Sequence, residues 1–400
     1  MKKIILLIIK CILILIIIPI SLFIILIRKF LLIRFGVIFT EKIGHLALDT
    51  ELYYLLKKKN NKKIITLDIL SYQKIVSNNF LKKKWSEKFF IIRFRHLVEL
   101  FAYTCQLISR SNLHNAKLFN NFTDYYLLNE YAASIKLSKN EIYKGKEILK
   151  EMGLSKESKY VCIHNRDNSY NLKHFSKKNW DYHDHRNFSV NSLIESAEEL
   201  TKLGYYVIRI GSIAEESLNS NNKKIIDYCN SKYQSDFMDI FLIANSEFYV
   251  GCDSGLCNVA RIFRKPIVFT NFTSIDQLYS TQQYEYQEAI WIIKHFYSIN
   301  LNRNLSLREI FDSGLYKLDS SEKLNDKGVK LIDNSPQEIR EITLEQEQCV
   351  KGVINYSKED IALQEKFWQI IDSYSKITKT TNKKIRIGKE FINKNKYLLD

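Results

Sequence analysis

Residues 251–255, Gly-Cys-Asp-Ser-Gly, form a short turn of small and polar residues between a strand pattern at 247–250 and a helix pattern at 255–263. Free N–H groups at the start of a helix, together with the helix dipole, favour an anion. The Ser254 hydroxyl can add a hydrogen bond, and Gly255 lets a phosphate approach the backbone closely. An ordinary capped turn has the same composition, so this feature alone leaves both interpretations open.

A second polar run follows the buried-type strand at 160–163. It reads His164-Asn165-Arg166-Asp167. Ligands bind at the carboxyl ends of the strands in open parallel sheets. The planar guanidinium of Arg166 can hold a diphosphate, and Asp167 can orient that arginine or a sugar hydroxyl. The alternative is a salt bridge within the loop.

The next predicted strand, 205–210, carries Arg209 and ends at Gly211, and Ser235 can cap the helix expected at 236–244. Arg209 is a second candidate for phosphate binding. Asp236 and Asp239 in the first turn of the helix are candidates for donor contacts, and an ion pair with Arg209 is their alternative role.

The polar loop between these strands contains His183, Asp184, His185 and Arg186. Two histidines and an aspartate suggest a metal, but their spacing is not that of a zinc site and no cysteine is close. This pattern therefore favours a loop that binds substrate by hydrogen bonds over a metal site. Arg186 is one of its candidates for phosphate binding. The sequence also contains no Asp-x-Asp, the pair with which many enzymes hold a divalent metal beside a diphosphate. We therefore expect no metal and no cofactor.

A candidate catalytic base lies near the N-terminus. A strand predicted at 36–39 is followed by Gly44-His45 and by a helix pattern at 46–56. Histidine can act as a base near neutral pH. Asp49, one turn further on, and Glu51 are further candidates. The alternative for His45 is a neighbour of the helix N-cap with no chemical role.

Strands that alternate with helices predict right-handed βαβ units and parallel sheets. We expect an α/β protein with two Rossmann-like domains facing a cleft, preceded by an N-terminal hydrophobic anchor helix. The expected boundaries are 1–35 for the anchor, 36–152 for the N-terminal domain, 153–330 for the C-terminal domain and 331–400 for helices that pack back on the body. A capping box at Ser335 and an amphipathic pattern at 358–375 predict the last two helices.

The anchor prediction rests on the uncharged, almost wholly apolar run of 17 residues at 11–27. Such a helix would be about 25 Å long, which is short for a bilayer, and the run at 4–9 could extend it. Basic residues are more numerous after the run, which favours a body on the cytoplasmic side of the inner membrane.

The seven cysteines are scattered without a CxxC pair and are expected to be reduced thiols.

The net charge of +16 is concentrated near the N-terminus, and the stretch 82–95 mixes lysines and arginines with aromatic residues. Basic and aromatic residues beside an apolar anchor suit an anionic membrane surface. A solvated face is the alternative. Nucleic acid would also attract such charge, but the sequence contains no nucleic-acid motif, so no nucleic-acid partner is expected.

Taken together, these motifs resemble those of two-domain glycosyltransferases of the GT-B type. The stretch 249–269 is similar to the donor-site motif of heptosyltransferases. The order and spacing of motifs over residues 34–375 resemble a less characterised family of bacterial glycosyltransferases. That likeness rests on Ile43-Gly44-His45, Ile163–Asp167, Tyr182–Asn187, Gly204–Gly211, Ser235–Asp239, Asp253–Gly255 and Gln364–Trp368. Heptosyltransferases carry Gly-Asp where this chain has Gly44-His45.

The resemblance implies a metal-independent glycosyltransferase of cell-surface polysaccharide synthesis. A nucleotide-sugar donor would bind in the C-terminal domain, and a glycan or lipid-linked acceptor at the membrane would bind near His45. The residues expected to bind the donor are His164, Arg166, Asp167, Arg186, Arg209, Gly211, Asp236, Asp239, Asp253, Ser254 and Gly255. The alternatives are a nucleotide-sugar epimerase of the same fold, a non-catalytic scaffold of glycan assembly, and a basic module that binds membranes or nucleic acid.

Overall fold

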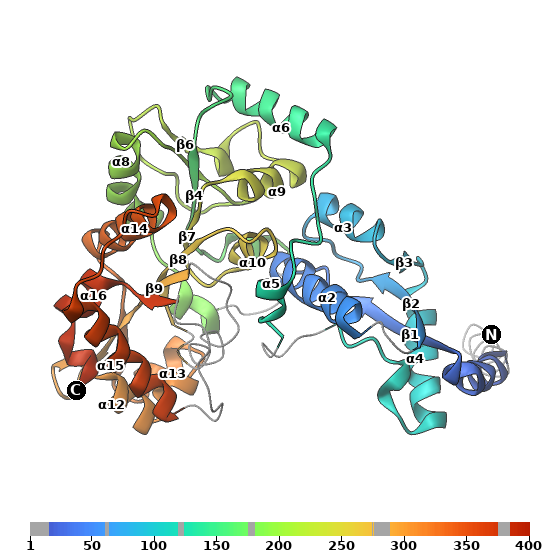
Figure 1. Ribbon diagram of the computed structural model, residues 1–400. Helices are drawn as coiled ribbons and strands as arrows, with labels where there is room; N and C mark the ends of the chain where they lie inside the picture. Colours follow the sequence, from blue (N-terminus) through green and yellow to red (C-terminus); the bar gives the residue numbers. More distant parts are fainter. Residues whose placement is uncertain are drawn as a thin grey trace. The chain divides into compact units, whose positions relative to one another are not determined.

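The computed structural model describes residues 16–60, 64–118, 124–174, 181–273, 275, 289–374 and 385–400. The chain divides into two compact units, Met1–Asn121 and Phe122–Asp400 (Figure 1). Both units are built on parallel sheets, so the expected α/β class is confirmed. Residues 1–15, the first part of the expected anchor, lie outside the described residues.

Unit 1 contains a three-stranded parallel sheet in the order β1-β2-β3. The strands are β1 (Leu31–Ile38), β2 (Ile65–Tyr72) and β3 (Phe90–Ile91), and the main helices are α2 (Thr50–Asn60), α3 (Asn79–Ser86) and α4 (Arg95–Ser109). A π-helical turn, η2 (His45–Asp49), leads into α2. The helix at 16–26 packs on this unit, because Ile24 shares a core cluster with Phe35 of β1 and Val98 of α4.

Unit 2 contains a seven-stranded parallel sheet in the order β13-β9-β8-β7-β4-β5-β6. The strands are β4 (Tyr160–His164), β5 (Tyr206–Arg209), β6 (Ile225–Asp227), β7 (Tyr249–Gly251), β8 (Ile267–Phe272), β9 (Ala289–Ile293) and β13 (Arg386–Ile387). From β4 the chain winds outward to β5 and β6. It then returns to the other side of β4 and winds outward again from β7. The strand order therefore reverses between β4 and β7, which is the topological switch point of a doubly wound sheet.

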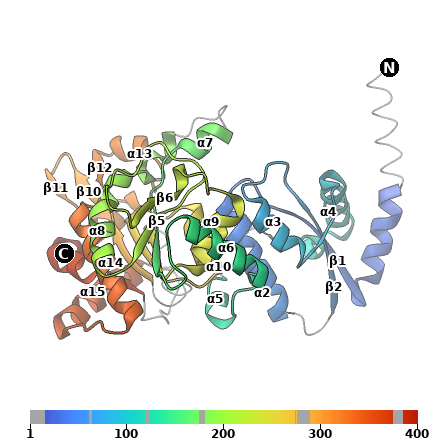
Figure 2. The same ribbon diagram turned by 90° about the horizontal axis from the view of Figure 1, so that it is seen from above.

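Helices cover both faces of this sheet, as Figures 1 and 2 show. One face carries α8 (Ile194–Lys202) and α14 (Pro336–Lys351), and the other carries α9 (Asp236–Asn245), α10 (Gly255–Ile262) and α6 (Lys139–Glu151). Strands covered on both faces have to be apolar throughout. The strands β7, β8 and β9 are accordingly buried at every position.

Smaller elements complete unit 2. An antiparallel sheet has the order β11-β10-β12 and consists of β10 (His295–Ser298), β11 (Arg303–Asn304) and β12 (Val329–Ile332). The remaining α-helices are α5 (Leu127–Glu130), α7 (Ser169–His174), α12 (Leu307–Asp312), α13 (Ser321–Asn325), α15 (Lys358–Tyr374) and α16 (Lys389–Lys394). The capping box predicted at Ser335 is present at the start of α14.

Three expectations differ from the structure. The first strand begins at Leu31 rather than at residue 36, because β1 pairs with β2 along its whole length. The N-terminal domain was expected to extend to residue 152, but α6 (Lys139–Glu151) lies in unit 2, with its Gly145 against Phe241 of α9. In the basic and aromatic stretch at 82–95, Trp85 is fully buried and Phe89 nearly so, so these two rings belong to the core of unit 1.

Candidate anion-binding site

The loops after β4 and β7 are neighbours at the switch point, because these two strands pair in parallel from Cys162↔Tyr249 to His164↔Gly251. A Cβ atom at Gly251 would lie 2.7 Å from the carbonyl oxygen of His164. Only glycine therefore lets the two strand ends approach this closely. The turn at 252–255 and the loop at 165–167 thus meet at the edge of the sheet where ligands bind in doubly wound folds.

The N-terminus of α10 opens at this edge. Ser254 is the N-cap, but its side chain makes no capping hydrogen bond within the part of the chain that the structure describes. Its hydroxyl lies instead 3.4 Å from the Tyr249 hydroxyl. Gly255 is the first residue of the helix and adds no side chain of its own in front of the backbone N–H groups. The start of α10 therefore presents its N–H groups and dipole to an anion.

Two arginines lie beside this helix start. Arg186 donates a hydrogen bond to the carbonyl of Asp253, and its Nη2 is 3.4 Å from the Asp253 carboxylate. Arg166 donates to the side chain of Asn187. Burial lowers the pKa of Arg166, and the positive charge of Arg186 lowers it further. The structure thus holds two like charges close together, an arrangement that an anion between them would stabilise.

Arg186 retains an unused donor. Its Nε is buried and has no hydrogen-bond partner among the described residues. A buried N–H group without a partner is destabilising. An anion at this position would satisfy that group.

Lys294 is a third cation near the switch point, and the sequence analysis missed it. It follows β9, is 3% exposed, and its Nζ donates to the Asn187 carbonyl at 2.8 Å and pairs with Asp333 at 2.6 Å. Burial raises the pKa of Cys252 to about 11, whereas the charges of Arg186, Arg166 and Lys294 act to lower it. A lysine directly after a buried strand was the signal that could have revealed this residue.

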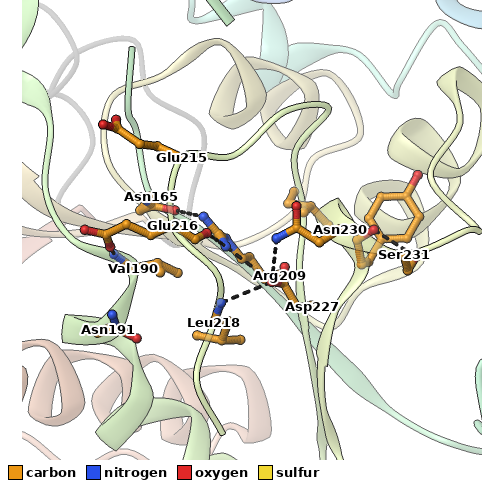
Figure 3. A network of polar contacts seen from close by, with 12 residues as sticks. Asn165, Val190, Asn191, Arg209, Glu215, Glu216, Leu218, Asp227, Asn230 and Ser231 are labelled. Carbon is orange, nitrogen blue, oxygen red and sulfur yellow. Dashed lines mark hydrogen bonds and ion pairs between the residues drawn. The ribbon is translucent and has the colours of Figure 1, made fainter. Parts of the chain in front are cut away.

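Arg209 lies within a network of polar contacts that includes Asn165, Glu216 and Asp227 (Figure 3). It is 1% exposed, and its guanidinium donates to the Asn165 side chain at 3.0 Å and to the carbonyl of Glu216. It also lies 3.5 Å from the carboxylate of Asp227, not from the acids of α9 that were considered as its partners. This buried arginine therefore positions the β4 and β5 loops, and direct contact with a phosphate would require it to move.

Asp167 has a similar supporting role. One carboxylate oxygen accepts from the backbone N–H of Ser169 at 3.0 Å, and the other accepts from that of Glu215 at 3.1 Å. The carboxylate therefore ties the β4 loop to the β5 loop. The structure shows no hydrogen bond between Asp167 and Arg166 among the described residues, and the expected orienting contact is accordingly not seen.

His164 and Gly211 lie at the carboxyl ends of the paired strands β4 and β5. The Nδ1 atom of His164 is 3.1 Å from the carbonyl oxygen of Ile210, and burial lowers the pKa of His164 to about 4. This histidine is therefore neutral near pH 7, and its Nδ1–H donates to that carbonyl. Gly211 has φ +152°, and a Cβ atom there would lie 3.2 Å from the Cys229 sulfur, so the site disfavours any larger residue.

The two aspartates of α9 lie in its first turn. Asp239 is 5% exposed, and its carboxylate accepts from the Tyr228 hydroxyl at 2.8 Å and from the Gln234 amide at 3.3 Å. Burial raises the pKa of Asp239 to about 7, and the nearby charge of Asp236 adds to the effect. Asp239 is thus a buried group whose protonation changes near neutral pH, and its contact with a donor stays a prediction.

In unit 1, His45 and Asp49 form a pair. The Nδ1 atom of His45 is 2.8 Å from Oδ2 of Asp49, and both residues belong to the π-helical turn η2. A carboxylate at Nδ1 holds the proton on that nitrogen and leaves Nε2 as the acceptor. Short π-helical segments are frequent at functional sites. The two residues proposed separately from the sequence are therefore brought together as a histidine–carboxylate dyad.

The described part of the chain contains no group of three or more His, Cys, Asp or Glu residues that could hold a metal ion. The side chain of His183 lies outside the described residues. Within the same part of the chain, no helix combines the length and apolar character that crossing a bilayer requires.

No family model matches this chain, and no curated protein matches it. Eleven chains among the solved structures are similar to parts of it, including the three that follow. E. coli ADP-heptose LPS heptosyltransferase II has 13% identity and a TM-score of 0.35, over 59% of this chain and 84% of its own. A glycosyl transferase family 9 protein from Veillonella parvula has 10% identity and a TM-score of 0.36, over 60% of this chain and 81% of its own.

The third is the iron-containing dodecameric glycosyltransferase TibC from enterotoxigenic E. coli. It has 12% identity and a TM-score of 0.31, over 60% of this chain and 59% of its own. Scores this low do not establish a common fold for the matched regions. The resemblance of the motifs to one glycosyltransferase family therefore stays a prediction.

Proposed function

We propose that this chain is a glycosyltransferase that binds a nucleotide-sugar donor by its diphosphate at the switch point of unit 2. The observation that carries the proposal is the pair Arg166 and Arg186, held beside the open N-terminus of α10, with a buried N–H of Arg186 lacking a partner among the described residues. This geometry supports an anion site. The order of the sequence motifs supports the reaction class.

The chemistry requires stabilisation of the leaving group. As the bond between the anomeric carbon and the diphosphate oxygen breaks, negative charge grows on that oxygen. Preorganised cations and backbone N–H groups stabilise such charge without rearrangement. This stabilisation would come from Arg166, Arg186 and the N–H groups of α10. The sequence contains no Asp-x-Asp motif, with which a metal ion could be held instead.

The acceptor hydroxyl requires a base. We assign this role to His45, whose Nδ1 is engaged by Asp49 at 2.8 Å. Its Nε2 would take the proton of the hydroxyl while the acceptor oxygen bonds to the anomeric carbon. A direct displacement of this kind inverts the anomeric configuration. Asp49 would orient the ring and stabilise the imidazolium that forms.

The proposed acceptor is a glycan or lipid-linked molecule at the inner membrane, and the body of the chain is proposed to lie on its cytoplasmic side. Support comes from the apolar N-terminal run and the basic residues that follow it. The structure describes this run only from residue 16.

The test is a thermal-unfolding screen of the full chain with ADP, GDP, UDP and CDP and with their sugars. A ligand at a hundredfold its Kd stabilises the folded state by about 2.7 kcal/mol, so a binding nucleotide should raise the unfolding temperature clearly. Absence of stabilisation by every compound would contradict the proposal. If the stabilising nucleotide sugar is instead epimerised in solution without an acceptor, the chain is an epimerase.

A further inference from the structure

Unit 1 exposes an unusually apolar surface on the helix at 16–26. One side of this helix is buried against the unit, with Ile17 2%, Ser21 0% and Ile24 6% exposed, at a spacing of four and three residues. The other side carries exposed apolar side chains, namely Ile16, Ile18, Ile20, Leu22, Phe23 and Leu26. The helix is therefore part of the fold of unit 1 on one side and exposed on the other.

The neighbouring helix α4 continues this surface. Figures 1 and 2 show the helix at 16–26 and α4 side by side, in agreement with their shared core cluster. Tyr103 and Leu107, one turn apart on α4, are 63% and 64% exposed. Soluble proteins rarely leave contiguous apolar patches of this kind open to water. We call the outward side chains of the two helices the apolar face.

A hollow of about 370 Å³ lies at the end of α4. It is lined by Tyr103, Gln106, Leu107, Arg110, Ser111 and Asn112. Apolar side chains and a cation thus border one depression. Arg110 is exposed and makes no ion pair with any residue that the structure describes. An apolar chain with an anionic head would match both kinds of lining.

The charges around the apolar face are predominantly positive. Residues 1–40 contain no acidic residue, and Arg28 and Lys29 come one residue after the helix at 16–26. Arg93 is exposed just before α4, and Glu99, the acid of α4, is paired with Arg95 at 2.8 Å. Cations around an apolar surface complement a bilayer that contains anionic lipids, because the lipid headgroups attract them while the acyl region receives the apolar side chains.

We infer that the apolar face is a docking surface for an anionic phospholipid bilayer, on which unit 1 lies with the helix at 16–26 and α4 in the interface. The helix at 16–26 is then a packed part of unit 1 on the side that faces the membrane, and not a separate flexible anchor. This inference does not depend on the reaction that unit 2 supports, so its test and that of the proposed function can fail separately.

The test uses the full chain with a spin label at Leu107→Cys, reconstituted into vesicles of phosphatidylglycerol and phosphatidylethanolamine. Power saturation compares collisions of the label with oxygen, which concentrates in the acyl region, and with a water-soluble nickel chelate. The matched control carries the label at Glu87→Cys, an exposed position of unit 1 after α3. Unmodified protein treated with the label gives the background from the native cysteines, and Tyr103→Cys is a second test position.

We expect the ratio of oxygen to nickel collisions at Leu107 to rise several-fold over the control in anionic vesicles. The rise should be much smaller in phosphatidylcholine vesicles and in an Arg110→Glu variant. An unchanged ratio in anionic vesicles would overturn the inference, and so would equal immersion in both lipids. Dipolar broadening that grows with protein concentration without vesicles would assign the face to a second copy of the chain and would also overturn it.

Discussion

Replacing Arg186 by alanine tests the anion site most directly. This arginine is the one whose Nη2 pairs with the Asp253 carboxylate at 3.4 Å, and its buried Nε has no partner among the described residues. The substitution removes a cation and several donors from the switch point. It also leaves the Asp253 carboxylate without this charge beside the place where the diphosphate would bind. Both effects should weaken binding.

The magnitude follows from the contacts. A hydrogen bond to a charged group contributes about 1.5–3 kcal/mol, which corresponds to a diphosphate Kd about 10- to 150-fold higher in the variant. The free energy of unfolding should change less than the free energy of diphosphate binding. The side chains of Arg186 and Asp253 are 24% and 19% exposed, and partly exposed ion pairs contribute about 1 kcal/mol or less to stability.

The assay is isothermal titration of the nucleoside diphosphate that gives the largest thermal stabilisation, with denaturant unfolding of the same samples. Arg186→Lys keeps the charge but loses the planar fork, and an intermediate Kd is expected. Arg303→Ala is the matched control, because Arg303 is an exposed arginine paired with Glu309 on another part of unit 2. Wild-type affinity in Arg186→Ala, with intact folding, would refute the assignment of this site.

Three further predictions address other residues. Gly251→Ala places a Cβ atom 2.7 Å from the His164 carbonyl oxygen; we expect a loss of about 1–3 kcal/mol in unfolding free energy and weaker diphosphate binding, and unchanged urea unfolding would count against this packing. Burial raises the pKa of Asp239 from 3.8 to about 7, so the folded state binds this proton more tightly and its contribution to stability falls as pH rises through that window. Asp239→Asn should remove that contribution, seen as a smaller difference in unfolding free energy between about pH 5 and pH 8, whereas an identical pH profile would contradict it. His45→Ala should lower the transfer rate about 10²- to 10⁴-fold with donor affinity unchanged, and Asp49→Asn should show a partial loss with an altered pH profile; wild-type transfer in either variant would remove the dyad from the mechanism.

Local patterns predicted most of the elements that carry the candidate site. The apolar runs at 160–163 and 247–250 are β4 and β7, and the helix patterns at 236–244 and 255–263 are α9 and α10. These predictions succeeded because a buried parallel strand needs a continuous apolar run and a helix start needs its cap, and both signals are local. The short strands β6 and β13 were missed, since two or three residues at the sides of a sheet carry no such signal.

The roles of the charged residues were harder to predict. The sequence placed Arg166 and Arg209 at the ends of neighbouring strands and treated them alike. In the structure, Arg209 is buried under the loops and hydrogen-bonded to Asn165, whereas Arg166 lies near Arg186 beside α10. Strand alternation and loop course decide which arginine reaches the surface, and neither is visible in the residue types. Lys294 directly follows a buried strand, which is a signal in the sequence, but its contacts with residues 187 and 333 join parts of the chain that are far apart.

By itself, the sequence indicated the α/β class, the turn at 251–255 and the choice of His45 and Asp49 as candidate catalytic residues. The spacing of apolar residues, helix caps and side-chain chemistry are all properties of short segments. Only the tertiary structure decided that β4 and β7 pair at the switch point, that Arg186 comes from a distant loop to the turn, and that one side of the helix at 16–26 belongs to the core of unit 1. These features depend on strand order and on contacts between residues far apart in the chain. Such contacts form where burial of apolar surface and pairing of charges are satisfied together, and no segment read alone contains both partners.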